Sequence, residues 1–236
     1  MINKFIVYGI PRVGSNYFIS QLNFHPKILC HYEVFHKKSI YYGFGDKNIK
    51  LPKEISVVQR DEAPAEFLDF IWSNSFGMQS VGYNIFPKQN EWVLQESLKD
   101  KTIKKIILKR KDILKSFVSM QIAMKTGSWS KYVKSGEDKR IHFDREKFIT
   151  YVMDINKYYN YLENNISLYG DDYLVIYYED FLKKRQQTLN DVFTFIGEEE
   201  YAVPGNDKFG RQNPEPLSEL IINYDELNYF RETHYL

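Results

Sequence analysis

Short apolar runs alternate along the chain with longer segments of helical periodicity. Four runs of strand length, rich in β-branched and aromatic residues, cover residues 5–8, 79–86, 105–108 and 173–177. Between them, apolar residues recur at steps of three and four, which is typical of helices that bury one face. This spacing predicts helices over residues 15–24, 65–74, 111–125, 145–169 and 186–196.

Strands that alternate with helices predict an α/β fold, a single domain with a central parallel sheet flanked by helices. Ligands of such sheets bind outside the carboxyl ends of the strands. The turns after Tyr8, Phe86, Leu108 and Tyr177 are therefore the expected places for a site. We expect the domain to span residues 1–236, with about 198–236 as an irregular C-terminal tail packed on it.

Composition removes several classes of protein. The chain of 236 residues is 43% hydrophobic and 27% charged, and its formal net charge of +1 gives no general reason to expect nucleic acid as a partner. A single cysteine excludes an intramolecular disulfide framework, and the histidine spacing matches no zinc pattern, so we expect no metal. No apolar window is long enough for a membrane span, and no signal-peptide core is visible, so the cytoplasm is the expected compartment.

The loop after the first strand carries the clearest chemical signal. Residues 9–16 read Gly-Ile-Pro-Arg-Val-Gly-Ser-Asn, with the glycine spacing of a phosphate-binding Walker A loop. Backbone amides at such a turn and at the following helix start favour a phosphate. The Walker lysine is absent, because Ser15 stands in its place, and Arg12 lies inside the loop instead. This pattern suits one phosphate beside a charged leaving-group oxygen, and it does not suit a magnesium-bound triphosphate.

Residues 11–17 resemble the loop of sulfotransferases that binds the 5′-phosphosulfate of 3′-phosphoadenosine 5′-phosphosulfate (PAPS). The resemblance implies that Arg12 contacts the bridging oxygen and the sulfuryl group. It places Gly14, Ser15 and Asn16 on the 5′-phosphate, whereas Val13 departs from the usual serine. The cofactor-binding residues implied in this loop are Arg12, Val13, Gly14, Ser15, Asn16 and Tyr17, the last facing the adenine.

Two later segments resemble further parts of the same family. Arg110 follows the strand at 105–108, and Ser119 lies nine residues on, like the pair that holds the 3′-phosphate; Ser116 is the alternative hydroxyl. Tyr178 matches a position that faces the adenine.

Arg211, in the tail, is expected to close over the 3′-phosphate. The alternatives without a ligand-binding role are a core tyrosine at position 178, a surface arginine at position 211 and a solvated basic face over residues 99–115.

Residues 23–36 resemble bacterial sulfotransferases that act on carbohydrate or glycolipid hydroxyls, which implies an acceptor of that class. In that family a glutamate at the position of Glu33 is the proposed general base, so Glu33 is the expected catalytic base. His36 and then His31 are the alternatives. Asn84 stands where the family pattern has a lysine. Aromatic residues make up 17% of the chain, either as core or as stacking surfaces, and those expected near an acceptor are Tyr41, Tyr42, Phe44 and Trp129.

The function expected from these segments is in-line transfer of a sulfuryl group from PAPS to an acceptor hydroxyl, with a carboxylate base and no metal. Two other hypotheses for the function stay open. One is a P-loop nucleotide kinase, which the missing lysine opposes. The other is a non-enzymatic module that binds an anionic glycan or nucleic acid through residues 99–115. Neither the particular acceptor nor the oligomeric state follows from the sequence.

Overall fold

The computed structural model describes residues 2–129, 138–205 and 213–234. The chain divides into two compact units. The first comprises residues 1–111 and 160–205, and the second comprises residues 112–159 and 206–236. A single domain over residues 1–236 stays a prediction.

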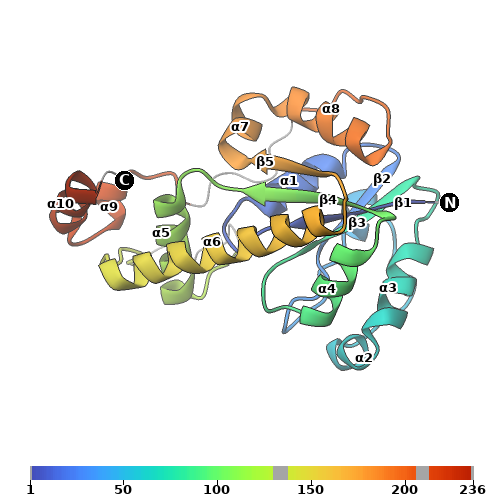
Figure 1. Ribbon diagram of the computed structural model, residues 1–236, viewed down its shortest axis with the longest axis horizontal. Coiled ribbons are helices and arrows are strands. Elements are labelled where there is room, and N and C mark those ends of the chain that lie inside the picture. Colours follow the sequence, from blue (N-terminus) through green and yellow to red (C-terminus); the bar gives the residue numbers. More distant parts are fainter. Residues whose placement is uncertain (1, 130–137, 206–212, 235–236) are drawn as a thin grey trace. The chain divides into compact units, whose positions relative to one another are not determined.

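The first unit contains a five-stranded sheet in the order β2-β3-β1-β4-β5, and every neighbouring pair is parallel (Figure 1). Its strands are β1 (Asn3–Tyr8), β2 (Ile28–Glu33), β3 (Ser80–Ile85), β4 (Ile103–Lys109) and β5 (Tyr173–Tyr177). The predicted α/β fold with a central parallel sheet is confirmed. From the central strand β1 the chain moves first to one side of the sheet and later to the other, so the β1–α1 turn lies at the topological switch point.

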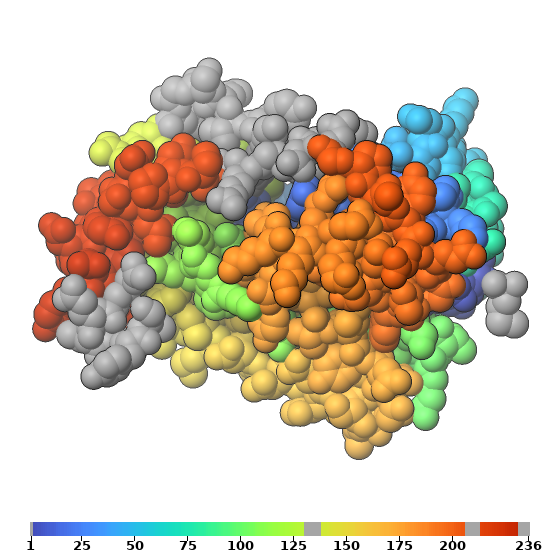
Figure 2. All heavy atoms as spheres, turned by 90° about the horizontal axis from the view of Figure 1, so that it is seen from above, coloured from blue at the N-terminus to red at the C-terminus, as the bar shows by residue number. Residues whose placement is uncertain are grey.

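Helices cover both faces of this sheet (Figure 1). One face carries α1 (Ser15–Leu22), α7 (Tyr178–Lys183) and α8 (Arg185–Ile196), and the other carries α3 (Pro64–Ser73) and α4 (Glu91–Lys99). The rings of Phe18 and Phe181 meet edge to face at 5.3 Å, which joins α1 to α7. On the other face the Tyr8 hydroxyl donates to Ser97 of α4 at 2.9 Å. Seen from above in Figure 2, residues of α7 and α8 form the orange surface of the first face.

The connection from β2 to α3 contains a short 3₁₀ helix, η1 (Phe44–Lys47), and α2 (Val57–Glu62). Ser56 caps α2, accepting from the amide of Gln59, whose side chain accepts from the amide of Ser56 in return. This reciprocal capping box fixes the start of the helix. α2 therefore begins at Val57, directly after the segment that follows β2.

The second unit is helical in its described residues. It contains α5 (Ile113–Thr126), the first part of α6 (Arg145–Leu168), α9 (Leu217–Leu220) and α10 (Tyr224–His234). Its core cluster consists of Phe117, Val118, Ile122, Ile141, Phe143, Phe148, Leu220, Ile221, Leu227 and Phe230. The expectation of an irregular tail is therefore wrong for residues 217–234. Its prolines precede the helices, and its apolar residues are spaced to bury one face.

No helix in the part of the chain that the structure describes has the length and apolar character of a membrane span.

Candidate functional site

The β1–α1 turn opens at the carboxyl edge of the sheet and has unusual backbone geometry. Gly14 has φ 95° and caps the start of α1, where its carbonyl accepts from the amide of Phe18 at 3.1 Å. Arg12 also lies in the left-handed region, with φ 70°. Glycine adopts this conformation without cost, but a residue with a Cβ atom, such as arginine, is strained there. Such strain persists where the surrounding structure holds it, often at functional sites.

Side chains from two distant segments close on this turn. A Cβ atom added at position 14 would overlap the ring of Tyr178, so only glycine fits there. Arg110 donates from Nη1 to the carbonyl oxygen of Arg12 at 2.8 Å. Its guanidinium carbon lies 5.4 Å from the centre of the Tyr178 ring. Four residues that the sequence assigned to one ligand, Arg12, Gly14, Arg110 and Tyr178, thus lie together.

The charge of Arg110 is only partly engaged by protein groups. Its Nε lies 3.5 Å from Oε1 of Glu179, an ion-pair distance, yet this buried Nε makes no hydrogen bond. Glu179 is itself held, since it accepts from the backbone amide of Lys111 at 2.8 Å. A buried cationic donor without a hydrogen bond suits an anionic oxygen supplied by a ligand. A phosphate contact was predicted for Arg110 from the sequence, but Glu179 was not identified there.

The remaining residues of the turn differ in what they offer. Val13 is fully buried, and its amide donates to the carbonyl of Ile10 at 3.3 Å, so it serves the packing of the turn. Ser15 is buried and Asn16 is exposed. The Tyr17 ring lies 5.5 Å from that of Phe181 in α7. Their predicted contacts to PAPS stay predictions.

Glu33 ends β2 at the same edge of the sheet. It pairs with Asn84 of β3 after an irregularity in register between His31 and Glu33. Its Oε2 accepts a hydrogen bond from Nε2 of Gln89 at 2.7 Å. Burial raises the pKa of Glu33 to about 7, while the Gln89 hydrogen bond acts in the lowering direction. A carboxylate with a pKa near neutrality suits general acid–base chemistry.

Asn84 is fully buried beside Glu33 in the sheet, and neither its Oδ1 nor its Nδ2 has a hydrogen-bond partner. An unsatisfied buried amide costs stability, and such groups are rare in folded proteins. The sequence drew attention to Asn84 only as a departure from a family pattern. The structure adds that both polar atoms of its side chain lack partners.

The two histidines weighed as alternative bases have different surroundings. His31 is fully buried, and its Nδ1 accepts from the amide of Gly43 at 3.0 Å. Burial lowers the pKa of His31 to about 3, which is the character of a structural, neutral histidine. Burial, and then the charge of Arg60, lower the pKa of His36, which is partly exposed and accepts at Nδ1 from the amide of Lys38.

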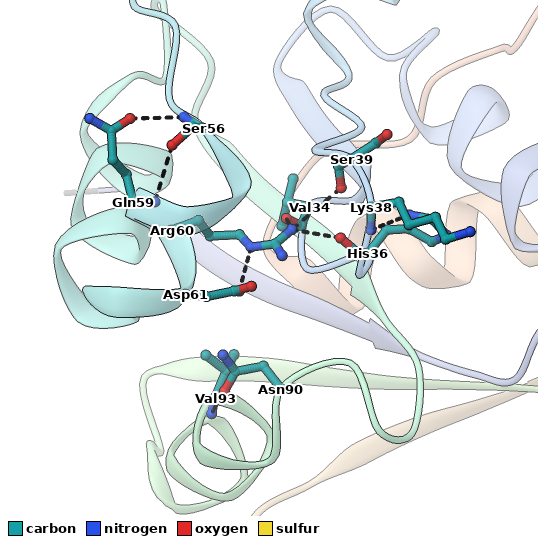
Figure 3. A network of polar contacts seen from close by, with 10 residues as sticks. All are labelled: Val34, His36, Lys38, Ser39, Ser56, Gln59, Arg60, Asp61, Asn90 and Val93. Carbon is teal, nitrogen blue, oxygen red and sulfur yellow. Dashed lines mark hydrogen bonds and ion pairs between the residues drawn. The ribbon is translucent and has the colours of Figure 1, made fainter.

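Arg60 of α2, which the sequence did not single out, holds the segment that follows Glu33 (Figure 3). Its side chain is 1% exposed, and Nη1 donates to three carbonyls, those of Val34 at 2.9 Å, His36 at 2.8 Å and Ser39 at 3.3 Å. The carbonyl of Glu33 accepts from the amide of His36. The backbone after Glu33 is therefore tied at several points.

Two of the predicted phosphate ligands, Ser116 and Ser119, belong to the second unit. Ser116 is fully buried, with its Oγ 2.9 Å from the hydroxyl of Tyr151. Ser119 is partly exposed and accepts from Nδ2 of Asn213 at 3.3 Å. Because its hydroxyl is more accessible, Ser119 is favoured over Ser116 as the predicted phosphate ligand. Arg211 lies outside the described residues.

The aromatic residues expected near an acceptor also separate into two groups. Tyr42 and Phe44 stack on one another at 5.2 Å, and Phe44 is 2% exposed, so both are packing residues. Tyr41 and Trp129 are about half exposed, at 47% and 51%. Within residues 2–129, 138–205 and 213–234, no group of three or more metal-ligating side chains is present.

No family model and no curated protein matches this sequence. In fold, the chain is similar to the crystal structure of a sulfotransferase from Alicyclobacillus acidocaldarius, with a TM-score of 0.54 and 16% identity. The match covers 99% of this chain and 92% of that chain. At this identity the likeness concerns the fold alone: the chain has a sulfotransferase-like fold.

Proposed function

We propose that this protein is a sulfotransferase that moves a sulfuryl group from PAPS to an acceptor hydroxyl on a carbohydrate or glycolipid. The observation that carries the proposal is the convergence of Arg12, Gly14, Arg110 and Tyr178 on one turn at the carboxyl edge of the sheet. Glu33 ends a strand at the same edge, and the fold likeness supports the assignment. The acceptor class rests on the resemblance of residues 23–36.

The residues present fit PAPS at one point that can be read from the structure. Arg110 keeps a buried Nε–H without a hydrogen bond while its neighbouring nitrogen holds the turn. In the proposed complex, the amides at the start of α1 and the side chains of Ser15 and Asn16 hold the 5′-phosphosulfate. Arg110 holds the 3′-phosphate, and Tyr17 and Tyr178 face the adenine.

Bound PAPS supplies the sulfuryl group and a phosphate leaving group. Glu33 takes the proton of the acceptor hydroxyl as that oxygen attacks, and its pKa near 7 suits this task. Arg12 offsets the negative charge that develops on the bridging oxygen, which makes its contribution largest in the transition state. Like phosphoryl transfer, the reaction depends chiefly on positioning and electrostatics.

Calorimetric titration separates this proposal from a nucleotide kinase. We expect adenosine 3′,5′-bisphosphate to bind and ATP with magnesium to bind weakly or not at all. Replacing Arg110 by Met should weaken bisphosphate binding about 10- to 100-fold, since one charge-assisted pair is lost. Arg140→Met is the matched control, because Arg140 is exposed and pairs only locally with Asp138 in the described contacts. Preference for ATP with magnesium would overturn the proposal.

Transfer itself is tested with PAPS carrying radiolabelled sulfur and a panel of glycans, glycolipids and small hydroxyl compounds. The expected result is label on a carbohydrate or glycolipid hydroxyl. Label only on small phenols would contradict the acceptor class. Absence of both label and bisphosphate binding would contradict the function as a whole.

A further inference from the structure

We propose that Gln89 is a positioning residue that fixes the Glu33 carboxylate for proton transfer. This inference rests on the proposed function, because it gives the proposed base its partner. Gln89 lies between β3 and α4, and it is 56 positions from Glu33 along the chain. Its Nε2 donates to Oε2 of Glu33 at 2.7 Å.

The amide of Gln89 is fixed at both of its polar atoms. Its Oε1 accepts from the backbone amide of Phe86 at 3.0 Å. An amide N–H needs an acceptor, so the oxygen of the Gln89 side chain must face Phe86. The nitrogen therefore faces Glu33 and can only donate there. The side chain cannot exchange its two ends without losing both hydrogen bonds.

The backbone around Gln89 is fixed as well. Lys88, the preceding residue, has φ 65°, a strained conformation for a residue other than glycine. The amide of Gln89 donates to the carbonyl of Phe86 at 3.4 Å, which closes the turn. Asn90, the following residue, caps α4 by accepting from the amide of Val93 at 2.9 Å (Figure 3). Gln89 is thus held between a closed turn and a capped helix.

A neutral donor has a specific effect on a buried base. A cation in its place would stabilise the carboxylate strongly and lower its basicity. Burial raises the pKa of Glu33, and the hydrogen bond from Gln89 lowers it; these are its two causes. The titratable and charged residues of the neighbouring segments are His31, Tyr32 and His36 of its own segment, Lys88 of the β3–α4 turn and Arg60 of α2.

These contacts give the two carboxylate oxygens different tasks. Gln89 engages Oε2. The proton of the acceptor hydroxyl then goes to Oε1, and the electron pair of the O–H bond stays on the attacking oxygen. Because the carboxylate is fixed at one oxygen, its other oxygen points in one direction. This reduces the number of carboxylate orientations that cannot take the proton.

A direct test follows the Glu33 carboxyl carbon by NMR titration in protein labelled with ¹³C-glutamate, with Glu33→Gln to assign the signal. Gln89→Met keeps the chain length but removes the donor, and we expect it to raise the pKa of Glu33 by about one unit. Gln95→Met is the matched control, because Gln95 is an exposed glutamine of α4. Gln89→Glu retains the acceptor for Phe86 and places a second carboxylate beside Glu33, so it should raise that pKa further.

The outcomes separate this inference from the proposed function. If neither Gln89→Met nor Gln89→Glu moves the Glu33 titration in folded protein, the inference is overturned, whether or not the protein transfers sulfuryl groups. If the titration moves, the pH profile of kcat supplies the second readout. The acidic limb should move upward by the same amount, with most of kcat recovered at high pH and KM for PAPS unchanged. An equal loss of kcat at every pH would indicate a merely structural residue and contradict the inference.

Discussion

Two titratable residues, the fully buried Lys105 and the half-buried Glu33, lie at opposite ends of the same sheet, and their surroundings differ. Lys105 is fully buried toward the amino ends of β4 and β5. Its Nζ contacts Oδ2 of Asp171 at 2.6 Å, the carbonyl of Asp100 at 2.8 Å and the carbonyl of Ile103 at 3.0 Å. An ammonium group has three N–H donors, so each one has a partner. The amino end of the sheet is therefore closed by a complete set of interactions.

The carboxyl end is incomplete by comparison. Glu33 is held by one neutral amide, and burial raises its pKa. Asn84 has two buried polar atoms without partners, and Arg110 has one. Completed polar groups stabilise a fold, whereas incomplete ones at the edge where α/β sheets bind ligands indicate a site for a polar ligand. The polar groups at the amino edge of the sheet thus stabilise the fold, and we propose the carboxyl edge as the ligand site.

Glu33→Gln should have the largest effect. A glutamine of the same size cannot accept the proton, so turnover should fall about 10²- to 10⁴-fold. Binding of adenosine 3′,5′-bisphosphate should stay near the wild-type value, because Glu33 does not hold that ligand. Initial rates of labelled sulfuryl transfer and calorimetry measure the two quantities. Retained turnover would remove Glu33 from the role of base.

Lys105→Met tests the other edge. Removing one partner of a buried ion pair leaves Asp171 uncompensated and should lower the free energy of unfolding by about 3–5 kcal/mol. Lys104→Met is the control, since Lys104 is exposed on the same strand, and its effect should stay below about 1 kcal/mol. Urea denaturation gives both values. Equal effects of the two substitutions would contradict the account of this edge.

Asn84→Leu tests whether the carboxyl edge sacrifices stability. Removing two unsatisfied buried polar atoms should raise the free energy of unfolding by about 1–3 kcal/mol and lower transfer activity. Ser80→Ala, at the other end of β3, should lower the free energy of unfolding, because Ser80 donates to the buried Glu198 at 2.5 Å. A destabilised Asn84→Leu protein would show that the amide is satisfied in solution.

Stability should also depend on pH. The pKa of Glu33 in the folded protein is about 7, above its ordinary value of 4.5, so the folded state favours the protonated form. The stability contributed by this group is fully present below about pH 4.5 and is lost as the pH rises through about 7. Glu33→Gln should therefore gain stability relative to wild type across this window. Urea denaturation from pH 4 to 8 at about unit steps measures it, and a difference independent of pH would contradict it.

Elements with a sustained apolar pattern could be predicted from the sequence. The predicted 173–177 strand and the 145–169 helix match β5 and α6 to within a residue. β2 was missed, because its apolar run is interrupted by His31, Tyr32 and Glu33. The carboxylate that we propose as the base thus disturbs the pattern that would reveal its strand. His31 is buried and structural, but this property is visible only in the structure, so it could not have indicated the strand beforehand.

Parts of the site that depend on distant side-chain pairs could not be predicted. The residues of the β1–α1 turn and Arg110 could be singled out because each lies next to a strand end in the sequence. Gln89 and Arg60 have no such signal, because their partners lie 56 and 26 positions away. A glutamine in a turn and an arginine in a short helix read as surface residues. Only the packing of the fold shows that one holds a carboxylate and the other three carbonyls.

Hydrogen–deuterium exchange with and without saturating adenosine 3′,5′-bisphosphate tests the contrast between the two edges most directly. The account predicts slower amide exchange in residues 9–17, at the turn and the first part of α1, and unchanged exchange in residues 98–105 near Lys105. Unchanged exchange in residues 9–17 at saturation, or protection confined to residues 98–105, would contradict the assignment of the carboxyl edge to the ligand.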